Sequence, residues 1–400
     1  MTDQTSAWAA AIRERETAVC AFAWVELERA QRASAAAPAG PLGGRWVGIK
    51  DVIDTAGIPT ERGSALFRGR VPDRSATLVT RIEAAGGVVA GKTVTAELAL
   101  FTPGPTTNPW DPTRTPGGSS MGSAAAIAAG MLPLATGTQT AGSIIRPAAF
   151  CGVVGFKPSF GRIPRDGVML LSETLDHLGG LATTVADVAE LCSVMAGSDL
   201  RPRPLDRPPR LGVYRSPEWP ELQPAAREQF DVTIERLRAA GATVEEAAAP
   251  AGFDVALSVQ RNIMVFEIAR NRGSDVARAP ELVSDRFRRT VANGQGLPER
   301  DYLAALADRE RLIISVVEWA GRYDGILSPP ALGEAPGLET TGDSRLCVRW
   351  TLVGAPAVSL PSGAGPAGLP LGLQVSGAPG SDRALMDTAA WVESALAASG

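Results

Sequence analysis

Histidine is almost absent from this sequence, since His177 is the only one among 400 residues. So few imidazoles argue against a zinc site, because zinc ions in proteins are held mostly by histidine and cysteine side chains. They also leave any nucleophilic serine without the base that commonly activates it. Cysteine pairs are lacking as well, and widely spaced thiols without a CxxC motif are typical of a reduced, cytoplasmic protein. These thiols belong to Cys20, Cys151, Cys192 and Cys347.

The sequence also lacks a basic-then-apolar leader and any run of about 18 apolar residues, so we expect no signal peptide and no membrane span. Its net charge is −4, and an acidic balance disfavours nucleic acid and anionic membranes as partners. With 45% hydrophobic and 20% charged residues, the composition is that of a globular protein with a large core. We therefore predict a cytoplasmic protein that binds no nucleic acid, no membrane and no metal.

Lysine is scarce, because only Lys50, Lys92 and Lys157 occur among 39 basic residues. Arginine keeps its proton in a protein, whereas a desolvated lysine can lose one and act as a base. Lys50 lies in VGIKD, a segment with strand patterning, so its side chain is expected to point into a poorly hydrated interior that lowers its pKa. A buried ion pair is an equal alternative for Lys50, although Asp51 would point to the opposite side of the strand.

Helical and strand patterns alternate from end to end, which predicts one α/β domain over residues 1–400 with a mixed central β-sheet covered by helices on both faces. We divide it into an N-terminal helical arm (1–37), a core (46–197), a βαβ unit with a helical pocket wall (211–325), and C-terminal strands with a helix (326–400). The expected helices cover 7–36, 75–85, 119–131, 185–197, 224–240, most of 255–320, and 383–398. Strands are expected at 46–55, 87–93, the segment LPLATGT, and three segments after residue 325.

The segment GGVVAGKT (86–93) matches the phosphate-binding pattern G-x-x-x-x-G-K-[ST]. A phosphate loop must follow a strand and open a helix, so that backbone N–H groups face the phosphates. Here a helical pattern precedes the motif, and VVAGKT itself has strand patterning. We therefore expect Lys92 to be a strand-end residue with a structural partner, and P-loop nucleotide binding is a remote alternative.

Two serines lie in segments that could carry chemistry. TPGGSSMGS (115–123) places Ser119 before a helix of small residues, where serine commonly caps the helix. GTQTAGSIIRPAAF (137–150) places Ser143 where a tight turn meets another helix. The N–H groups of such a turn can converge on one point and form an oxyanion hole. Taken alone, each segment is better explained as a helix cap.

Taken together, these segments resemble the amidase signature family, which are serine hydrolases of amides with a Ser–Ser–Lys triad. The matching blocks run in order along nearly the whole chain and include all three lysines. The longest are GIKDVIDTAGIPT (48–60), TTNPWDPTRTPGGSSMGSAAAIAAG (106–130) and GTQTAGSIIRPAAFCGVVGFKPSFGRIP (137–164). The resemblance implies the amidase signature fold, in which the GGVVAGKT block is a strand.

The resemblance also assigns a role to each matched residue. Ser143 corresponds to the nucleophile, Ser119 to the bridging serine, which the family holds on a cis peptide, and Lys50 to the base. Neutral Lys50 would take a proton from Ser119, which takes one from Ser143, and Ser143 would attack the amide carbonyl. His177 is then a structural residue. The oxyanion hole corresponds to the backbone amides of Thr140, Ala141, Gly142 and Ser143.

Residues 137–148 depart from the family pattern, because many members read GTDTGGSIRxPA where this chain reads GTQTAGSIIRPA. Gln139 replaces an acid, and the arginine moves from two to three places after the nucleophile, a rotation of about 100° on a helix. The loss of a structural ion pair would free Arg146 to face the pocket. Malonamidase-like members share this pattern and use that arginine for a substrate carboxylate, which could be bound bidentately. A position on the helix surface is an equal alternative for Arg146.

The resemblance therefore implies a cofactor-free amidohydrolase that cleaves the C–N bond of a small linear amide through a Ser143 acyl-enzyme and a Ser119/Lys50 relay. A carboxylate on the substrate is a further expectation. The alternative within the family is the glutaminase subunit of a tRNA amidotransferase. The expected partner is the small-molecule amide itself, and a homodimer is compatible with the sequence.

Overall fold

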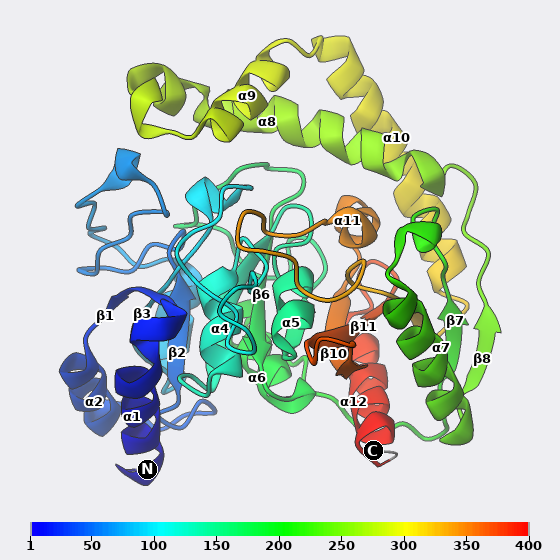
Figure 1. The fold of residues 1–400 in the computed structure, drawn as a ribbon, viewed down its shortest axis with the longest axis horizontal. Helices are drawn as coiled ribbons and strands as arrows, with labels where there is room; N and C mark the ends of the chain where they lie inside the picture. Colours follow the sequence, from blue (N-terminus) through cyan, green and yellow to red (C-terminus); the bar gives the residue numbers. More distant parts are fainter. Residues whose placement is uncertain (1, 399–400) are drawn as a thin grey trace.

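The computed structural model describes residues 2–398, and its strands form one 11-stranded mixed sheet (Figure 1). The strands are β1 (Phe22–Val25), β2 (Trp46–Lys50), β3 (Val88–Thr93), β4 (Leu134–Gln139), β5 (Val154–Lys157), β6 (His177–Ala182), β7 (Arg210–Val213), β8 (Thr243–Glu246), β9 (Gly325–Ser328), β10 (Ala357–Ala364) and β11 (Pro370–Ser376). Their order is β1-β3-β2-β4-β6-β5-β10-β11-β9-β7-β8. β3, β2 and β4 are parallel, as are β9, β7 and β8, whereas neighbours between these groups are antiparallel. The prediction of a single α/β domain around a mixed sheet is confirmed.

Helices cover both faces of this sheet, as predicted (Figure 1). The helices are α1 (Thr2–Val19), α2 (Leu27–Ala36), α3 (Thr77–Ala84), α4 (Met121–Ala128), α5 (Ile145–Cys151), α6 (Val185–Ala196), α7 (Pro224–Ala239), α8 (Ala256–Arg278), α9 (Asp285–Gln295), α10 (Glu299–Ala320), α11 (Arg345–Leu352) and α12 (Asp382–Ala398). α4 and α5 pack on one face, and α3, α6 and α12 pack on the other. β7, α7 and β8 form the predicted βαβ unit with parallel strands.

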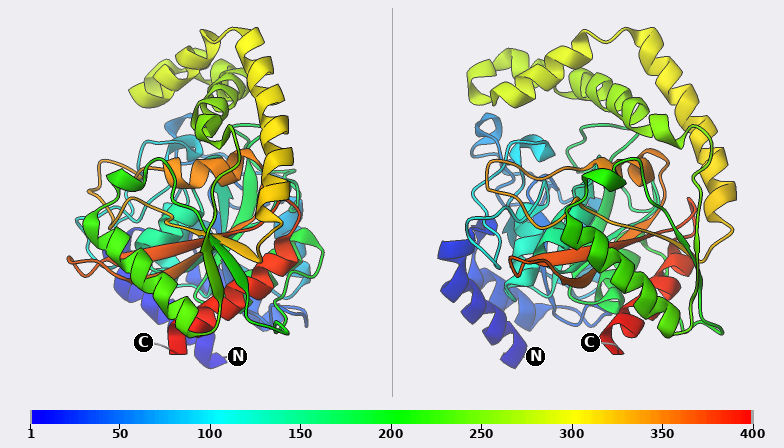
Figure 2. Two further views of the ribbon diagram at one scale, coloured as in Figure 1. Left: turned by 90° about the vertical axis from the view of Figure 1, so that its right-hand side faces the viewer. Right: turned by 45° about the vertical axis from the view of Figure 1, so that its right-hand side comes forward.

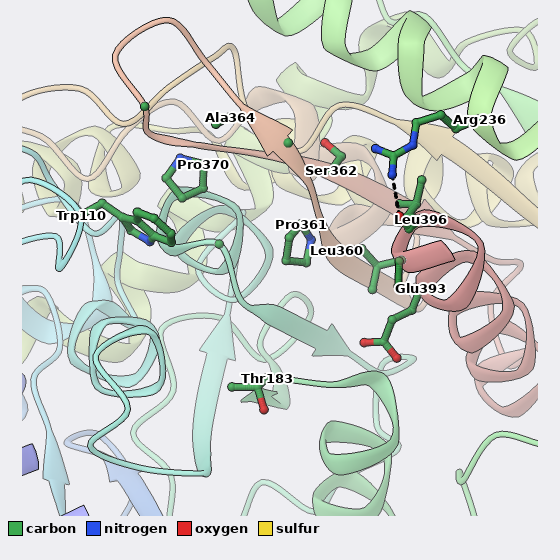
Figure 3. A pocket seen from close by; sticks show the side chains of 14 residues that line it. Trp110, Thr183, Arg236, Leu360, Pro361, Ser362, Ala364, Pro370, Glu393 and Leu396 are labelled. Atoms are coloured by element: carbon green, nitrogen blue, oxygen red, sulfur yellow. Dashed lines mark hydrogen bonds between the residues drawn. The ribbon is translucent and has the colours of Figure 1, made fainter. Parts of the chain in front are cut away.

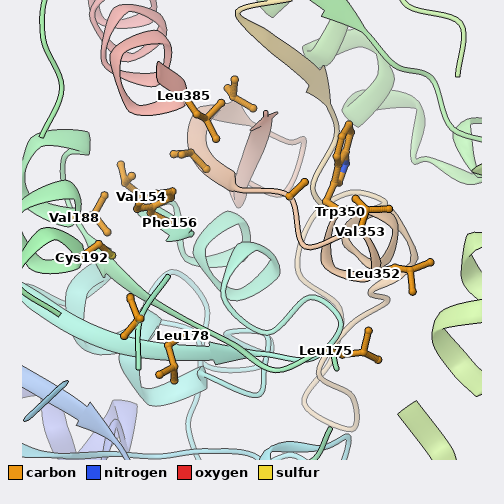
Figure 4. Packing of buried hydrophobic residues seen from close by; sticks show 14 of the residues in the cluster. Val154, Phe156, Leu175, Leu178, Val188, Cys192, Trp350, Leu352, Val353 and Leu385 are labelled. Atoms are coloured by element: carbon orange, nitrogen blue, oxygen red, sulfur yellow. The ribbon is translucent and has the colours of Figure 1, made fainter. Parts of the chain in front are cut away.

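The core on the α6 side is built from side chains that alternate along each strand, as the two-residue period of a β-strand requires. Phe156 of β5 and Leu178 of β6 point to this face, where they belong to one buried cluster with residues of α6 and α12 (Figure 4). On the opposite face, glycines let α5 approach the sheet closely. A Cβ added at Gly155 would lie 2.6 Å from the Cβ of Ala148, so the absence of a side chain there sets the position of α5.

α8, α9 and α10 form an arch above the ends of the strands on one side of the molecule (Figures 1 and 2). α8 packs along α9, α10 and α11, so the arch is tied to the main body through α11. The helical content predicted for most of 255–320 is confirmed. Gln260 of α8 reaches the carbonyl of Thr140, directly after β4, which places the carboxyl ends of β2 and β4 beneath the arch.

The single helix predicted over residues 7–36 is wrong, because β1 separates α1 from α2. The carboxylate of Glu16 accepts hydrogen bonds from the N–H groups of Ala21 (3.0 Å) and Phe22 (2.9 Å), and Cys20 takes a φ of +52°. β1 then pairs antiparallel with β3. Apolar residues continue through the break at a spacing that a helix also allows, so the periodicity did not reveal it.

Smaller differences concern element ends and missed strands. The strand predicted over 46–55 ends at Lys50, and the helix predicted over 119–131 covers only Met121–Ala128. β5 and β6 were not predicted at all. No helix within residues 2–398 is long and apolar enough to cross a lipid bilayer.

The GGVVAGKT segment lies in a strand and not in a phosphate loop. β3 spans Val88–Thr93 and leads to a loop and a single 3₁₀ turn before residue 102, so no helix N-terminus is available to bind phosphate. Nζ of Lys92 contacts the carbonyl of Ile53 and lies 2.8 Å from Oγ1 of Thr60 and 3.8 Å from a carboxylate oxygen of Asp51. The strand prediction and the structural partner predicted for Lys92 are confirmed.

Candidate active site

Lys50 is the last residue of β2, and its side chain is completely buried. Its Nζ lies 2.7 Å from Oγ1 of Thr138 on β4 and 2.8 Å from Oγ of Ser119. Among residues 2–398 no carboxylate forms an ion pair with this amine. Burial therefore lowers the pKa of Lys50 well below its usual value, and the negative charge of nearby Asp176 opposes this shift only in part. The buried ion pair considered above as an alternative for Lys50 is therefore not found within residues 2–398. Asp51 lies beside Lys92 instead.

The two serines lie on segments that run side by side. Ser119 precedes α4 and is 1% exposed, and its peptide bond with Gly118 is cis, as the resemblance implied. Ser143 occupies the turn between β4 and α5 and is 8% exposed. The N–H of Ser120 donates to the carbonyl of Ser143 over 3.3 Å. Within residues 2–398 no hydrogen bond joins the two hydroxyl groups, so the direct contact in this state is the one between Ser119 and Lys50.

Gln139 ends β4 and holds the turn that carries Ser143. Its side-chain oxygen accepts hydrogen bonds from the N–H groups of Ile144 (2.8 Å) and Ile145 (3.0 Å), at the start of α5. Its Nε2 donates to Oγ1 of Thr351 over 2.9 Å. A neutral amide therefore performs the capping work that an acid could do at this position, and it needs no cationic partner. The N–H groups of Ala141, Gly142 and Ser143 in the same turn have no hydrogen-bond partner among the described residues.

Arg146 is buried and does not lie on the helix surface, which excludes one of the two alternatives weighed for it. Its Nε donates to the carbonyl of Thr341 (2.7 Å), and its Nη2 donates to the carbonyl of Gly118 (2.6 Å). Its Nη1 is buried without a hydrogen-bond partner among the described residues. A Cβ built on Gly142 would lie 2.8 Å from Nη1, so the unpaired donor adjoins the turn. Burial lowers the pKa of Arg146, while Cys347 and Asp343 oppose that shift.

Sequence reasoning missed four residues around this site. Asp176 is buried beside the turn, where its carboxylate accepts from Oγ1 of Thr140 over 2.5 Å, and burial raises its pKa to about 6. Gln260 and Thr351 donate to carbonyls of the same turn from α8 and α11. Thr138 contacts Lys50. Only Thr138 and Asp176 lie in blocks that carried a signal, GTQT and SETLDHLG.

His177 lies apart from these groups, in the core of the protein. Its Nδ1 lies 2.6 Å from the carbonyl oxygen of Leu175, and its ring packs edge-on against Phe160. Burial, followed by the positive charge of Lys157, lowers the pKa of His177 well below its usual value, so the ring stays neutral. These contacts agree with the structural role expected for this histidine.

A surface cavity of about 500 Å³ lies between the β10–β11 hairpin and α12, and none of the predicted site residues lines it (Figure 3). Both charged residues that line it form hydrogen bonds with backbone groups at helix ends. Arg236 donates to the carbonyl of Leu396 over 2.5 Å, and Glu393 accepts from the N–H of Val185 over 2.9 Å at the start of α6. This cavity is therefore separate from the residues around Lys50.

The site combines a poorly solvated amine, two serine hydroxyls and a turn with free N–H groups. Burial favours the neutral amine, which can accept a proton from a hydroxyl at hydrogen-bond distance. Free N–H groups beside a nucleophilic oxygen can stabilise the negative charge of a tetrahedral intermediate. Such an arrangement can transfer an acyl group to a serine without a histidine.

Comparisons of sequence and structure relate the chain to known proteins. The family model described as Amidase matches residues 2–386. A protein of Symbiobacterium thermophilum, named as a subunit of glutamyl-tRNA(Gln) amidotransferase, is 34% identical, with 94% of this chain and 90% of that protein aligned. A solved structure described as an amidase superposes with a TM-score of 0.91 at 31% identity, over 98% of this chain and 95% of the other. Native peptide amidase from Stenotrophomonas maltophilia superposes with a TM-score of 0.86 at 27% identity, over 99% and 93% of the two chains.

Proposed function

The chain belongs to the amidase signature family of enzymes that act on amide C–N bonds, and on this premise we propose that it hydrolyses a small linear amide through an acyl-enzyme on Ser143. One observation carries the proposal. Nζ of Lys50, fully buried and without a carboxylate partner among residues 2–398, lies 2.8 Å from Oγ of Ser119. A lysine in this environment is a base, because its neutral form is favoured.

In the first half of the reaction, neutral Lys50 accepts a proton from Ser119, which accepts one from Ser143. Oγ of Ser143 forms a bond to the amide carbon, and the carbonyl oxygen becomes an oxyanion. The N–H groups of Ala141, Gly142 and Ser143 stabilise that charge. The same relay then returns a proton to the nitrogen, the C–N bond breaks, and ammonia or an amine leaves.

In the second half, water replaces the amine. It gives a proton to the relay as it attacks the ester carbon of the acylated Ser143, and a second tetrahedral intermediate forms in the same turn. The ester bond breaks, the proton returns to Oγ of Ser143, and the acid is released. Proton balance requires only Lys50 and Ser119, so the residues of one chain account for both steps.

Arg146 supports the further proposal that the substrate carries a carboxylate. Its Nη1 is buried beside Gly142 and lacks a partner among the described residues, and leaving such a charged donor unpaired is costly. Its other donors are fixed on the carbonyls of Thr341 and Gly118, which hold the guanidinium in place. A carboxylate on the acyl part of the substrate would supply the missing acceptor.

A second candidate function is the glutaminase subunit of a tRNA amidotransferase. The sequence relatives support it better than the first candidate, because the relative from Symbiobacterium thermophilum is named as a subunit of glutamyl-tRNA(Gln) amidotransferase and aligns over most of its length. Glutamine is itself a small primary amide with a carboxylate, so both candidates require the same site chemistry. They differ in the fate of the ammonia and in whether another protein is needed.

The nucleophile is tested with Ser143→Ala and a fluorophosphonate probe. We expect the probe to add one phosphonyl group to the wild-type protein and none to the variant, because only an activated serine reacts. Intact-protein mass spectrometry measures the adduct, and ammonia release from primary amides measures turnover. Ser193→Ala, on the remote α6, is the control and should label fully. An adduct on the Ser143→Ala protein would refute the assignment.

The carboxylate is tested with Arg146→Ala on pairs of amides that differ only in a carboxylate. A hydrogen bond to a charged group contributes about 1.5–3 kcal/mol, so we expect kcat/KM to fall about 10- to 100-fold more for the charged amide than for the neutral one. The comparison within one variant cancels any loss of folded protein. An equal fall of kcat/KM on both substrates would indicate that Arg146 has a structural role and binds no substrate carboxylate.

A further inference from the structure

Three successive peptide groups in the turn before Ser143 each have their carbonyl held by a hydrogen-bond donor. The carbonyl of Thr140 accepts from Nε2 of Gln260 (3.1 Å), and that of Ala141 accepts from Oγ1 of Thr351 (2.7 Å). The carbonyl of Gly142 accepts from the N–H of Arg146 (2.9 Å) in the first turn of α5. Every peptide group of this turn therefore has its oxygen fixed by a separate donor.

A fixed carbonyl also fixes the N–H of the same peptide group, because the C=O and N–H of a planar trans peptide point in opposite directions. The cis bond found among residues 2–398 is the one between Gly118 and Ser119, so the turn peptides are trans. The N–H groups of Ala141, Gly142 and Ser143 have no hydrogen-bond partner in the described chain. Each of them points away from the donor that holds its own carbonyl and is available to an oxyanion.

Two of the three donors come from parts of the fold far away in sequence. Gln260 belongs to α8 of the arch, and Thr351 belongs to α11 beneath it (Figure 2). Both side chains are buried, at 3% and 0% exposure, so water cannot replace them easily. Thr351 also accepts from Nε2 of Gln139 over 2.9 Å. The nearer acceptor for its own proton is the carbonyl of Ala141 at 2.7 Å, against 3.2 Å for the carbonyl of Cys347. Side chains from α8, α11 and β4 therefore all form hydrogen bonds that hold this turn.

We propose that Gln260 and Thr351 are positioning residues that hold the oxyanion hole in its active geometry before substrate binds. The proposal rests on the function proposed for the turn and adds which side chains make it effective. Without its donor, a carbonyl beside the site can rotate inward, which turns the following N–H away from the oxyanion. The transition state then loses a donor, whereas the ground-state amide loses little.

The test compares variants that remove one donor while keeping the size of the side chain. Loss of a full oxyanion donor lowers kcat about 10²–10³-fold, so we expect Thr351→Val and Gln260→Met each to lower kcat about tenfold or more, with KM within about twofold. Rates are expressed per active site titrated with the fluorophosphonate, which removes the contribution of misfolded protein. Thr351→Ser restores the hydroxyl and should recover most of the wild-type kcat.

Matched controls separate positioning from a general loss of packing. Thr388→Val removes a buried helical hydroxyl that bonds, like Thr351, to a carbonyl four residues earlier, but on the remote α12. Gln229→Met removes a helical amide that donates to the carbonyl of Ser362. Both controls should lose stability and keep the wild-type kcat per titrated site.

Two results would overturn the proposal, and a third would overturn the function beneath it. Wild-type kcat per site in both Thr351→Val and Gln260→Met refutes positioning, as does a Thr351→Ser enzyme no faster than Thr351→Val. If one variant does not fold, the other still decides. A wild-type protein that neither labels at Ser143 nor hydrolyses any amide refutes the proposed function instead.

Discussion

The three lysines of the chain are all buried, yet their neighbours differ in a way that selects one of them for proton transfer. Burial lowers the pKa of Lys92 to about 8 and that of Lys157 to about 7. Lys92 has the carboxylate of Asp51 within 3.8 Å, and Lys157 contacts only backbone carbonyls as acceptors. Lys92 also lies 2.8 Å from the hydroxyl of Thr60, but the carboxylate of Asp51 favours its protonated form. Lys50 combines a serine hydroxyl at 2.8 Å with the absence of a carboxylate partner among residues 2–398.

The pH dependence of the reaction follows from the charges around Lys50. Its neutral form is the base, so kcat/KM should rise with pH through the pKa of Lys50, which burial sets well below 10.5. Ionised Asp176 raises that pKa, because it stabilises the protonated amine. Asp176→Asn removes the charge, so the rising limb of the profile should move to lower pH. Profiles of kcat/KM against pH measure the shift.

Asp73→Asn is the control for this experiment, because Asp73 is an exposed carboxylate outside the site. Its profile should coincide with that of the wild-type protein, since solvent screens an exposed charge. The absolute rate of the Asp176→Asn enzyme will also fall, because Asp176 accepts from Thr140, but the position of the limb does not depend on that loss. A limb that stays in place or moves to higher pH would contradict the role given to Asp176.

Among single residues, the sequence predicts those proposed to do the chemistry but not those proposed to hold them in place. Ser143, Ser119 and Lys50 lie in blocks whose order resembles a known family, and the structure places Lys50 and Ser119 in contact. Gln260 and Thr351 lie 120 and 210 positions from the carbonyls that they hold. Nothing in the sequence around a buried glutamine or threonine indicates such a partner, because the contact exists only once the sheet and the arch have formed.

At the scale of elements, a separate prediction concerns β3, the strand that carries Lys92. At pH 7 a pKa of about 8 for Lys92 and of about 6 for Asp51 leaves both groups charged between β3 and the turn after β2. Lys92→Met leaves Asp51 buried without its cation, which should lower the free energy of unfolding by about 3–5 kcal/mol. Chemical denaturation at pH 8 measures the loss, and labelling of Ser143 at low temperature should persist.

Measurements at a second pH and a second substitution test whether the buried charge of Asp51 causes the loss of stability. In the variant the folded-state pKa of Asp51 rises further above its unfolded value, so stability falls as pH increases from the unfolded-state pKa to the folded-state pKa. The deficit should therefore be smaller at pH 5 than at pH 8. Adding Asp51→Asn should recover part of the stability, because the orphaned charge disappears. A deficit independent of pH, or abolished labelling of a folded variant, would contradict a structural role for Lys92.

Elements of the fold were predictable where local pattern and tertiary packing agree. α6 begins with Thr184 capping the N–H of Asp187 and ends at Gly197, as its sequence indicates. β6 reads HLGGLA, and glycine disfavours an isolated strand. Its glycines are required by packing instead, because a Cβ on Gly180 would lie 3.1–3.2 Å from side chains of α6. Strands of this kind are determined by their neighbours and have no signature of their own.

For the whole molecule, the main consequence of the fold is that one chain supplies every group of the proposed relay. β2 contributes the base, the loop before α4 contributes Ser119, and the β4–α5 turn contributes Ser143. The arch and α11, which are formed later in the chain, hold that turn through Gln260 and Thr351. No group in the proposed relay is left to be completed by a second protein.

We therefore expect the purified chain to hydrolyse amides without a second protein. Ammonia release per chain should be independent of protein concentration, since dilution cannot remove a group that the chain itself supplies. Glutamine belongs in the substrate panel, because one relative is named as part of an amidotransferase. Ammonia release with the chain alone, on glutamine or another carboxylate-bearing amide, supports a self-sufficient amidohydrolase. Activity that appears only after the other components of an amidotransferase are added, while Ser143 labels normally without them, would favour the glutaminase function instead.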